Sequence, residues 1–453
     1  MMRRVTPLLQ RVGALTLAGF ATSTAFGLDW NQFRGPDGSG VIPSAQLPKE
    51  WSAEKNLAWK TPIKGTGWSS PIVVDGSIFV TAAVFPDQPR PSGFRRGVSS
   101  MRTYRQDSEK MITETDFVLH SLRLEDGKLN WSRTVTTKKP AFTIHPSNTY
   151  ATSSPATDGT HIFTYFAAAG VVAATTLDGK PAWERYLGAF PAGNGFGAGS
   201  SLMIGDGLLF LQCDNDEQSF AIALEPDSGE TVWRVDRNSR TSWSTPILWE
   251  NRFGKELILC GADTVTSLEP QTGKEIWKLT GFGGSFSSTP AFDSDRIYFG
   301  NSGPGSAGPL TTVEAGARGA VPYQKGQASK YSPWARTGSG PGLSSPVAYE
   351  GLLYISAGSG ILSCYDTSTG DRLYKERLPN SGSVAASLWI ADDQLYALDE
   401  LGTTHIIQTG PEFKVARTNQ IEDLFWSTPA VFNNTILMRG ADFLYCVREE
   451  SAL

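Results

Sequence analysis

The sequence is poor in the residues that build covalent cross-links and metal centres, with four cysteines and four histidines among 453 residues. The cysteines form neither a CxxC pair nor a CxxCH haem site, which excludes a disulfide-stapled scaffold and a c-type cytochrome. All four lie in apolar, strand-like runs and are interpreted as buried thiols, with one disulfide between Cys213 and Cys260 left open because they occupy matching places in neighbouring repeats. The histidine spacing assembles no histidine-rich metal site.

Charge is also sparse, at 19% of residues with a formal net charge of -5. No global basic field is present, so we expect no nucleic-acid binding. Beyond the N-terminus no apolar run approaches the 18 or more residues of a membrane span, and no cysteine follows the leader to accept a lipid. The sequence therefore predicts neither a membrane span nor a lipid anchor.

Residues 1–27 resemble a signal peptide, because Arg3 and Arg4 precede an apolar stretch from Val12 to Phe20, and small residues follow near Ala25. A buried N-terminal helix is the alternative. We expect an exported protein, periplasmic or secreted, whose residues 28–453 form one domain.

Glycine and proline are abundant, with 47 and 27 copies, and they punctuate a repeat. A Ser-Ser/Thr-Pro element followed by a β run, a short turn and a second β run recurs at 69–71, 153–155, 244–246, 288–290, 344–346 and 427–429, with weaker copies from Gly199 and Ala385. Most intervals lie in the forties, a period typical of propellers. A Gly-containing turn and an aromatic residue close the units, at Trp131, Trp183, Trp233, Trp277 and Tyr374.

These patterns predict an all-β, eight-bladed β-propeller of four-stranded antiparallel blades, with the closing aromatics packed between blades. The last copy holds only three strands, ending near FLYCVREE, whereas residues 56–63 precede the first copy and read as an outer strand. We therefore expect the N-terminal strand to complete the last blade, leaving no open edge.

The repeats resemble those of pyrroloquinoline quinone (PQQ) repeat propellers, a family that includes quinoprotein dehydrogenases and the propeller lipoprotein of the outer-membrane assembly machine. The segments WNQFRGPDGSG (30–40), HPSNTYATSSP (145–155) and CDNDEQSF (213–220) further resemble exported PQQ-like proteins. The resemblance covers nearly the whole chain and implies the fold. It does not decide the function, because the family mixes enzymes with scaffolds.

Turn lengths predict that one face carries the function. Four long insertions, 85–115, 132–152, 186–199 and 300–342, are expected on the face where the inner strands begin. Segments 90–113, 132–152 and 316–343 carry a net charge of +11 in total, which favours an anionic partner. Loop charges scattered by chance are the alternative.

Aromatic residues precede several inner strands, where the chain enters the central channel. Trp68, Trp243 and Trp426, with Phe286 near the equivalent place, are candidates to stack on a ligand or to pack linkers against blades. His145 and Asn148 are candidates for hydrogen bonding at the same mouth. Asp214, Asn215 and Asp216 form an oxygen-rich turn, which is either a calcium cluster or an ordinary polar turn.

Two classes of function remain. The first is a non-catalytic propeller that binds a protein or an anionic ligand on its basic, loop-rich face, with no catalytic residue and no assigned cofactor. The second, implied by the resemblance, is a PQQ-dependent oxidoreductase holding PQQ and calcium. The sequence lacks the adjacent cysteines that quinoprotein alcohol dehydrogenases usually carry, which favours binding. A carbohydrate-binding propeller that uses the tryptophans to bind a glycan is a further alternative.

Overall fold

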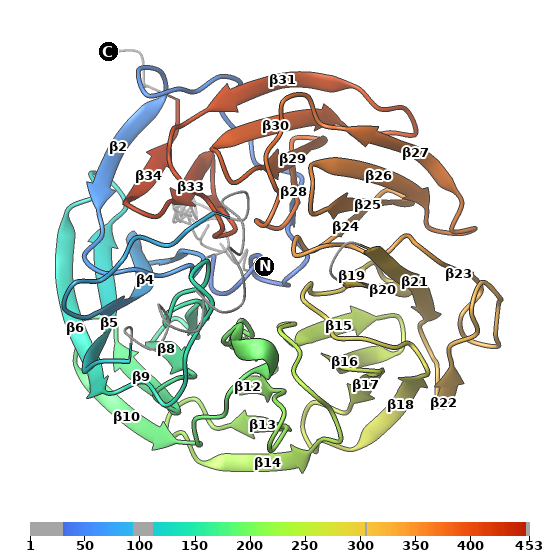
Figure 1. The fold of residues 1–453 in the computed structure, drawn as a ribbon, viewed down its shortest axis with the longest axis horizontal. Coiled ribbons are helices and arrows are strands. Elements are labelled where there is room, and N and C mark those ends of the chain that lie inside the picture. Colours follow the sequence, from blue (N-terminus) through green and yellow to red (C-terminus); the bar gives the residue numbers. More distant parts are fainter. Residues whose placement is uncertain (1–29, 94–111, 304–305, 450–453) are drawn as a thin grey trace, which may run out of the picture.

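A computed structural model describes residues 30–93, 112–303 and 306–449, and they form eight sheets arranged around one axis (Figure 1). The chain is all-β, as the repeats predict, and the eight Ser/Thr-containing copies begin the eight inner strands. Consecutive strands of each blade pair antiparallel, most of them through short turns, so the blades are meanders. The leader assigned to residues 1–27 lies outside the described residues.

The first four blades follow one another from β3 to β18. Their strands are β3 (Ile72–Val74), β4 (Ser77–Val84), β5 (Thr115–Arg123) and β6 (Leu129–Lys138); β7 (Ala156–Thr157), β8 (His161–Phe166), β9 (Val171–Thr176) and β10 (Pro181–Tyr186); β11 (Met203–Gly205), β12 (Leu208–Cys213), β13 (Phe220–Leu224) and β14 (Thr231–Asp236); β15 (Ile247–Asn251), β16 (Gly254–Gly261), β17 (Thr264–Leu268) and β18 (Glu275–Thr280). A short 3-10 helix, η2 (Gly193–Gly195), precedes blade three.

The remaining blades complete the ring. Their strands are β19 (Ala291–Phe292), β20 (Arg296–Gly303), β21 (Ser306–Glu314) and β23 (Ala335–Arg336); β24 (Val347–Tyr349), β25 (Leu352–Ala357), β26 (Ile361–Asp366) and β27 (Arg372–Arg377); β28 (Trp389–Ala391), β29 (Gln394–Leu398), β30 (Thr403–Gln408) and β31 (Val415–Gln420); β32 (Ala430–Phe432), β33 (Thr435–Arg439), β34 (Phe443–Val447) and β2 (Leu57–Pro62). Two further strands, β1 (Val41–Ile42) and β22 (Gly319–Pro322), add parallel to β28 and β18.

The N-terminal strand closes the ring, as the sequence predicts. Strand β2 pairs antiparallel with β34, from Leu57 opposite Val447 to Pro62 opposite Phe443, and forms the outer strand of blade eight (Figure 1). Blade eight is thus built from both ends of the described chain. Because β2 covers the edge of β34, this blade has the same four-stranded meander as its neighbours.

A ring of hydroxyl groups joins the inner strands and explains why serine or threonine recurs in the motif. In seven of the eight junctions, the backbone N–H of one motif residue donates to the side-chain hydroxyl of the corresponding residue in the next blade, at 2.9–3.4 Å. The members are Ser70, Ser154, Ser201, Thr245, Thr289, Ser345, Ser387 and Thr428. At the junction between blades eight and one, the Ser427 hydroxyl donates to the Ser69 carbonyl instead.

Tryptophans of the outer strands join neighbouring blades, as the sequence predicts. The Trp183 indole N–H donates to the Pro226 carbonyl of the next blade at 2.7 Å, and a Cβ on Gly229 would lie 2.6 Å from the Trp183 ring. Equivalent contacts to the next blade's turn are made by Trp59, Trp131, Trp233 and Trp334. The turn glycine has positive φ, 68° at Gly229, so the motif needs glycine for its backbone and for the room it leaves the indole.

Blade four departs from this pattern. The Trp277 indole donates to the buried Glu256 carboxylate of its own blade at 2.6 Å, and β22 pairs alongside its strand, with Trp277 opposite Gly319. The contact between blades five and six comes from Trp334, near the end of the long insertion 300–342.

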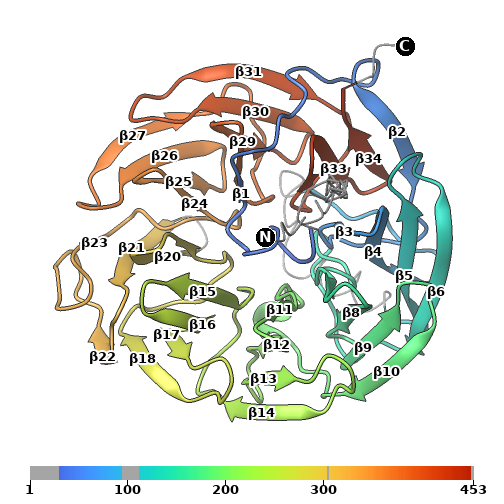
Figure 2. The ribbon, with the colours of Figure 1, turned by 180° about the vertical axis from the view of Figure 1, so that it is seen from behind.

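The N-terminal segment 30–42 crosses the axis on the face opposite the start of the inner strands (Figure 2). The Trp30 carbonyl accepts from Val73 N–H in blade one, and the Gln32 side-chain oxygen accepts from Ile204 N–H in blade three. Arg34 donates to the Pro346 carbonyl at the start of blade six, and burial lowers its pKa to about 10. The segment therefore ties together blades on opposite sides of the ring and covers one end of the axis.

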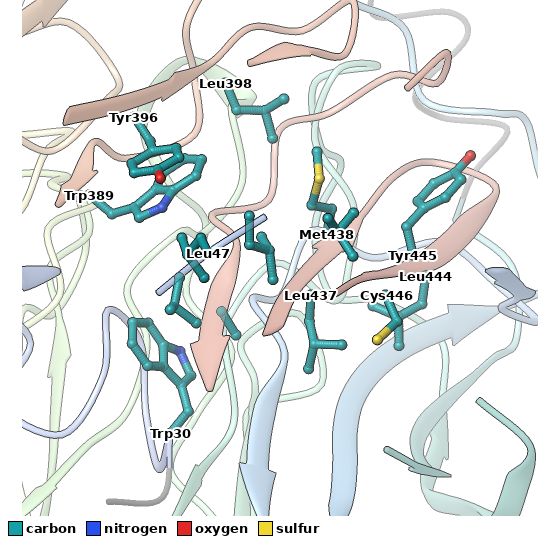
Figure 3. Packing of buried hydrophobic residues seen from close by; sticks show 14 of the residues in the cluster. Trp30, Leu47, Trp389, Tyr396, Leu398, Leu437, Met438, Leu444, Tyr445 and Cys446 are labelled. Atoms are coloured by element: carbon teal, nitrogen blue, oxygen red, sulfur yellow. The ribbon is translucent and has the colours of Figure 1, made fainter. Parts of the chain in front are cut away.

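Apolar residues in this segment and after it pack into the core of blades seven and eight (Figure 3). Trp30 and Leu47 share one buried cluster with Trp389, whose ring stacks on Tyr396 at 5.2 Å. We call the face bearing this segment the closed face, and the face where the inner strands begin the open face.

The four cysteines are unpaired thiols, so Cys213 and Cys260 do not form the disulfide that the sequence leaves open. Burial raises the pKa of the Cys260 thiol well above its usual range. No helix among the described residues is long and apolar enough to span a membrane.

Blade one contains a histidine that the fold holds neutral. His120 is buried, its Nε2 donates to the Lys64 carbonyl at 3.0 Å, and its Nδ1 accepts from the Ser132 hydroxyl at 2.6 Å. Burial lowers its pKa from 6.5 to about 4.

We expect acid to weaken the fold through His120. Between these pKa values the unfolded chain binds a proton that the folded chain does not, so stability falls as pH drops from about 6.5 towards 4. The free energy of unfolding of the wild type should decrease by about 2.5 kcal/mol more than that of His120→Asn between pH 7.5 and 4.5. Urea titrations at both pH values measure this difference, and equal decreases would contradict it.

Candidate functional site

The open face carries the aromatic residues that the sequence singles out. The Trp68 and Trp426 rings stack with centroids 6.3 Å apart and their planes inclined by 25°. Trp68 is 5% exposed, and its indole N–H donates to the Ser147 carbonyl at 2.8 Å, whereas Trp426 is half-buried. Trp68 thus packs under the entrance loop of blade two, and Trp426 keeps part of its surface exposed.

A second aromatic group adjoins this pair through the same loop. The His145 ring stacks on Phe196 at 5.3 Å, and Phe196 meets the Trp243 ring edge-on at 6.1 Å. Phe196 is 39% exposed and Trp243 is half-buried. His145 Nδ1 contacts the Ser147 hydroxyl at 2.7 Å, and burial lowers the pKa of His145, which favours a neutral imidazole at neutral pH.

Hydrogen bonds hold this group in place. The Asn148 side chain donates to the Phe196 and Ala198 carbonyls at 2.7 and 3.2 Å, and the Trp243 indole donates to the Gly197 carbonyl at 2.6 Å. Loop 196–198 is therefore fixed from both sides by side chains, and its exposed phenyl ring is presented in one orientation.

Phe286 contacts this group through its backbone and not through its ring. Its carbonyl accepts from Trp243 N–H at 2.8 Å, but its ring is buried against Phe282. The structure thus brings Trp68, His145, Asn148, Trp243 and Trp426 into one continuous patch with Phe196, which we call the mouth patch. Phe286 supports the patch from below.

Phe196 was not identified from the sequence, although it is the most exposed ring of the patch. It lies in the glycine-rich run NGFGAGS, which contains no periodic signal. An isolated phenylalanine inside such a run is the signal that marks it, because glycines on both sides cannot bury a large ring by themselves.

The prediction of a basic open face is wrong for the third of its three segments and for Arg133 of the second. The insertion after β21 connects the third and fourth strands of blade five, so it starts from the closed face. Its strand β22 lies along the outer edge of blade four (Figure 1). Arg318 and Arg336 accordingly reach Glu256 and Asp371. Arg133 of the second segment donates to the Gly179 carbonyl, in a turn of the closed face.

Of the basic residues in the first segment, the structure describes Arg90. Arg90 pairs with Asp423 and Asp442 at 2.7 and 2.9 Å, so acids from blade eight and its entrance loop neutralise it. Arg95, Arg96, Arg102, Arg105 and Lys110 lie outside the described residues.

The oxygen-rich turn after β12 uses its oxygens within the protein. Asp214 is buried and pairs with Arg237 at 2.8 Å, and the Asn215 side-chain oxygen accepts from Glu217 and Gln218 N–H. The Asp216 carboxylate accepts from the backbone N–H and from the hydroxyl of Thr241. These contacts are those of a structural turn, and calcium binding there stays a prediction.

Comparison with known proteins places the chain among PQQ-like propellers. A family model described as outer membrane protein assembly factor BamB matches residues 50–195 and 216–318, more than half of the chain. No curated protein shows significant similarity to the sequence.

Solved structures share the fold at low identity. BamB from Moraxella catarrhalis is 14% identical with a TM-score of 0.52, over 74% of this chain and 90% of that one. Quinohemoprotein alcohol dehydrogenase from Comamonas testosteroni is 11% identical with a TM-score of 0.61, over 94% and 81%. Sqt1 from Saccharomyces cerevisiae is 13% identical with a TM-score of 0.56, over 89% and 100%. Likeness at such identities establishes the fold alone.

Proposed function

Because the chain belongs to the family described as outer membrane protein assembly factor BamB, we propose that it is an exported, non-catalytic propeller that binds a protein partner on its open face. The family description names a protein of an assembly machine rather than an enzyme. The partner contacts the mouth patch, and the closed face serves the fold.

The observation that carries this proposal is the partly exposed aromatic surface of the mouth patch. Phe196, Trp243 and Trp426 each keep part of their ring exposed, and hydrogen bonds fix the loop that carries Phe196. Aromatic anchors held rigidly are typical of binding hot spots, since little conformational entropy is lost when they are covered. These three side chains are uncharged, which suits a protein surface better than an anionic ligand.

The described residues do not fit a quinone cofactor with its calcium ion. Among them, the only group of three His, Cys, Asp or Glu side chains whose ligand atoms converge lies on the closed face, away from the mouth patch. The chain has no adjacent cysteines, and the Asp214 carboxylate is paired with Arg237. Binding therefore accounts for the open face better than redox catalysis does.

Phe196→Asp should weaken partner capture from a periplasmic extract at least about tenfold, because a carboxylate in a desolvated aromatic contact is costly. Phe253→Asp is the matched control, since Phe253 is an exposed phenylalanine, 60% accessible, on the turn between β15 and β16 of the closed face. Immobilised wild type and variants are compared by quantitative mass spectrometry.

Capture that survives Phe196→Asp, or that is lost with Phe253→Asp, would contradict binding at the mouth patch. Unchanged melting temperatures show that both variants fold. Binding of the wild type to a soluble glycan array, with loss in Phe196→Asp, would assign the patch to carbohydrate instead.

A further inference from the structure

Three potential metal ligands from two blades meet on the closed face. Asp158 lies in the turn between β7 and β8, His161 begins β8, and Asp227 lies in the turn between β13 and β14 of the next blade. One ligand atom from each lies within 4.8 Å of the others. Among the described ranges, no other group of His, Cys, Asp and Glu side chains converges in this way.

The separations suit a shared ion better than direct hydrogen bonds. His161 Nδ1 lies 3.5 Å from Asp158 Oδ2 and 3.9 Å from Asp227 Oδ1. Two ligands bound about 2.1 Å from one tetrahedral zinc ion are about 3.4 Å apart. Small side-chain movements therefore suffice to place both carboxylates and the imidazole on one ion.

Backbone contacts already orient two of the ligands. Asp158 Oδ1 accepts from the backbone N–H groups of Thr160 and His161 at 2.8 and 2.7 Å, which leaves Oδ2 directed at the imidazole. The Asp158 and His161 side chains are 20% and 18% exposed. Asp227 is 92% exposed and free to complete the set.

The charge of the group calls for a cation. Within the part of the chain that the structure describes, neither carboxylate has a lysine or arginine within 4.0 Å, and His161 is the ionisable partner of both. The Thr160 hydroxyl is the other polar group at His161 Nδ1, 3.1 Å away, and a bound ion would replace this contact. Two carboxylates facing one imidazole nitrogen repel its lone pair unless a proton or a metal ion lies between them. A divalent ion neutralises both carboxylates.

We propose that Asp158, His161 and Asp227 bind one zinc ion, which joins blades two and three on the closed face. A mixed imidazole and carboxylate set favours zinc over calcium or magnesium, which take oxygen ligands. The remaining coordination position faces solvent and takes water. This site is independent of the partner proposed for the open face.

Equilibrium dialysis of the EDTA-treated protein against zinc tests the site. The wild type should bind one zinc ion per chain, and His161→Gln and Asp227→Asn should each weaken binding at least about tenfold. Glu230→Gln is the matched control, because Glu230 is an exposed acid of the same turn as Asp227. It should leave binding unchanged. Asp158→Asn also weakens binding while an amide oxygen keeps the turn contacts of Oδ1.

A second measurement distinguishes zinc binding by His161 from a purely structural role of its side chain. Zinc should raise the melting temperature of the wild type and of Glu230→Gln but not of His161→Gln, since a ligand stabilises only the state that binds it. Absence of zinc binding by the wild type, or equal binding by His161→Gln and Asp227→Asn, would overturn the proposal.

Discussion

Deleting residues 56–63 should abolish the folded monomer. The deletion removes β2, which covers β34 along five register pairs from Leu57 to Pro62. It also removes the Trp59 and Thr61 side chains, which donate to the Leu124 and Gly127 carbonyls of blade one. The ring would then open at the junction between its last and first blades, and the bare edge of β34 would be free to pair with another chain.

Size-exclusion chromatography with light scattering and far-UV circular dichroism measure this outcome. We expect aggregates or oligomers, or an unfolded chain. Trp59→Ala is a milder companion that keeps β2, and it should cost about 1–3 kcal/mol, because Trp59 is partly buried, and leave a monomer. A stable monomeric deletion variant with cooperative unfolding would contradict closure by β2.

Gly402→Ala should be among the most damaging single substitutions in the chain. Gly402 lies on the open face in the turn between β29 and β30, with φ of 88°, and an added Cβ would lie 1.7 Å from the Ile421 carbonyl oxygen. The overlap is with backbone, so no side chain can move to relieve it. The turn would shift and lose the hydrogen bond from Ile421 N–H to the Gly402 carbonyl.

Gly207→Ala is the matched control, because Gly207 has a similar φ of 78° but no atom within 4 Å of an added Cβ. Its free energy of unfolding should fall by about 1–2 kcal/mol, which is the cost of placing a residue with a Cβ at positive φ. Gly402→Ala should lose at least about 3 kcal/mol more, measured as the free energy of unfolding in urea. Equal losses would show that the turn can move, and that this part of the open face is less rigid than its contacts indicate.

Much of the fold could be predicted because its information is local and repeated. Ser70 and its seven counterparts recur because, at seven of the eight junctions, the hydroxyl of one accepts the backbone N–H of its counterpart in the preceding blade, so the motif and the ring share one physical cause. The turn glycines recur with the tryptophans because five of the indoles lie on a glycine of the next blade, namely those of Trp59, Trp131, Trp183, Trp233 and Trp334. Repetition of both features along the chain specifies the number of blades.

The insertion in blade five could not be placed from loop length alone. The insertion lies between the third and fourth strands of the blade, β21 and β23, rather than between the second and third. Because β23 is only two residues long, the sequence gives little sign of the fourth strand. The signal that would have placed it is Trp334 followed by Arg336. The same Trp-x-Arg pattern occurs at Trp131 and Trp183, where the arginine donates to a turn carbonyl of the next blade.

The burial of the N-terminal segment and the exposure of the mouth-patch residues could not be predicted from the sequence. Arg34 lies in a polar, glycine-rich run that is typical of an exposed loop, yet it is buried because blade six supplies a carbonyl for its guanidinium. Trp68 and Trp243 occupy equivalent positions in the repeat, yet Trp68 is buried and Trp243 half-exposed. The Trp68 indole donates to the entrance loop of the following blade, whereas the Trp243 indole donates to that of the preceding blade, so only tertiary contacts distinguish the two.

Equilibrium titration of PQQ into residues 28–453, with and without calcium and followed by dye reduction with alcohols and sugars, tests the central claim most directly. A propeller whose open face binds a protein partner should show no binding at high micromolar PQQ and no turnover. Tight, calcium-dependent binding with turnover would contradict a non-catalytic role and would make the mouth patch and the Asp214 turn parts of an active site.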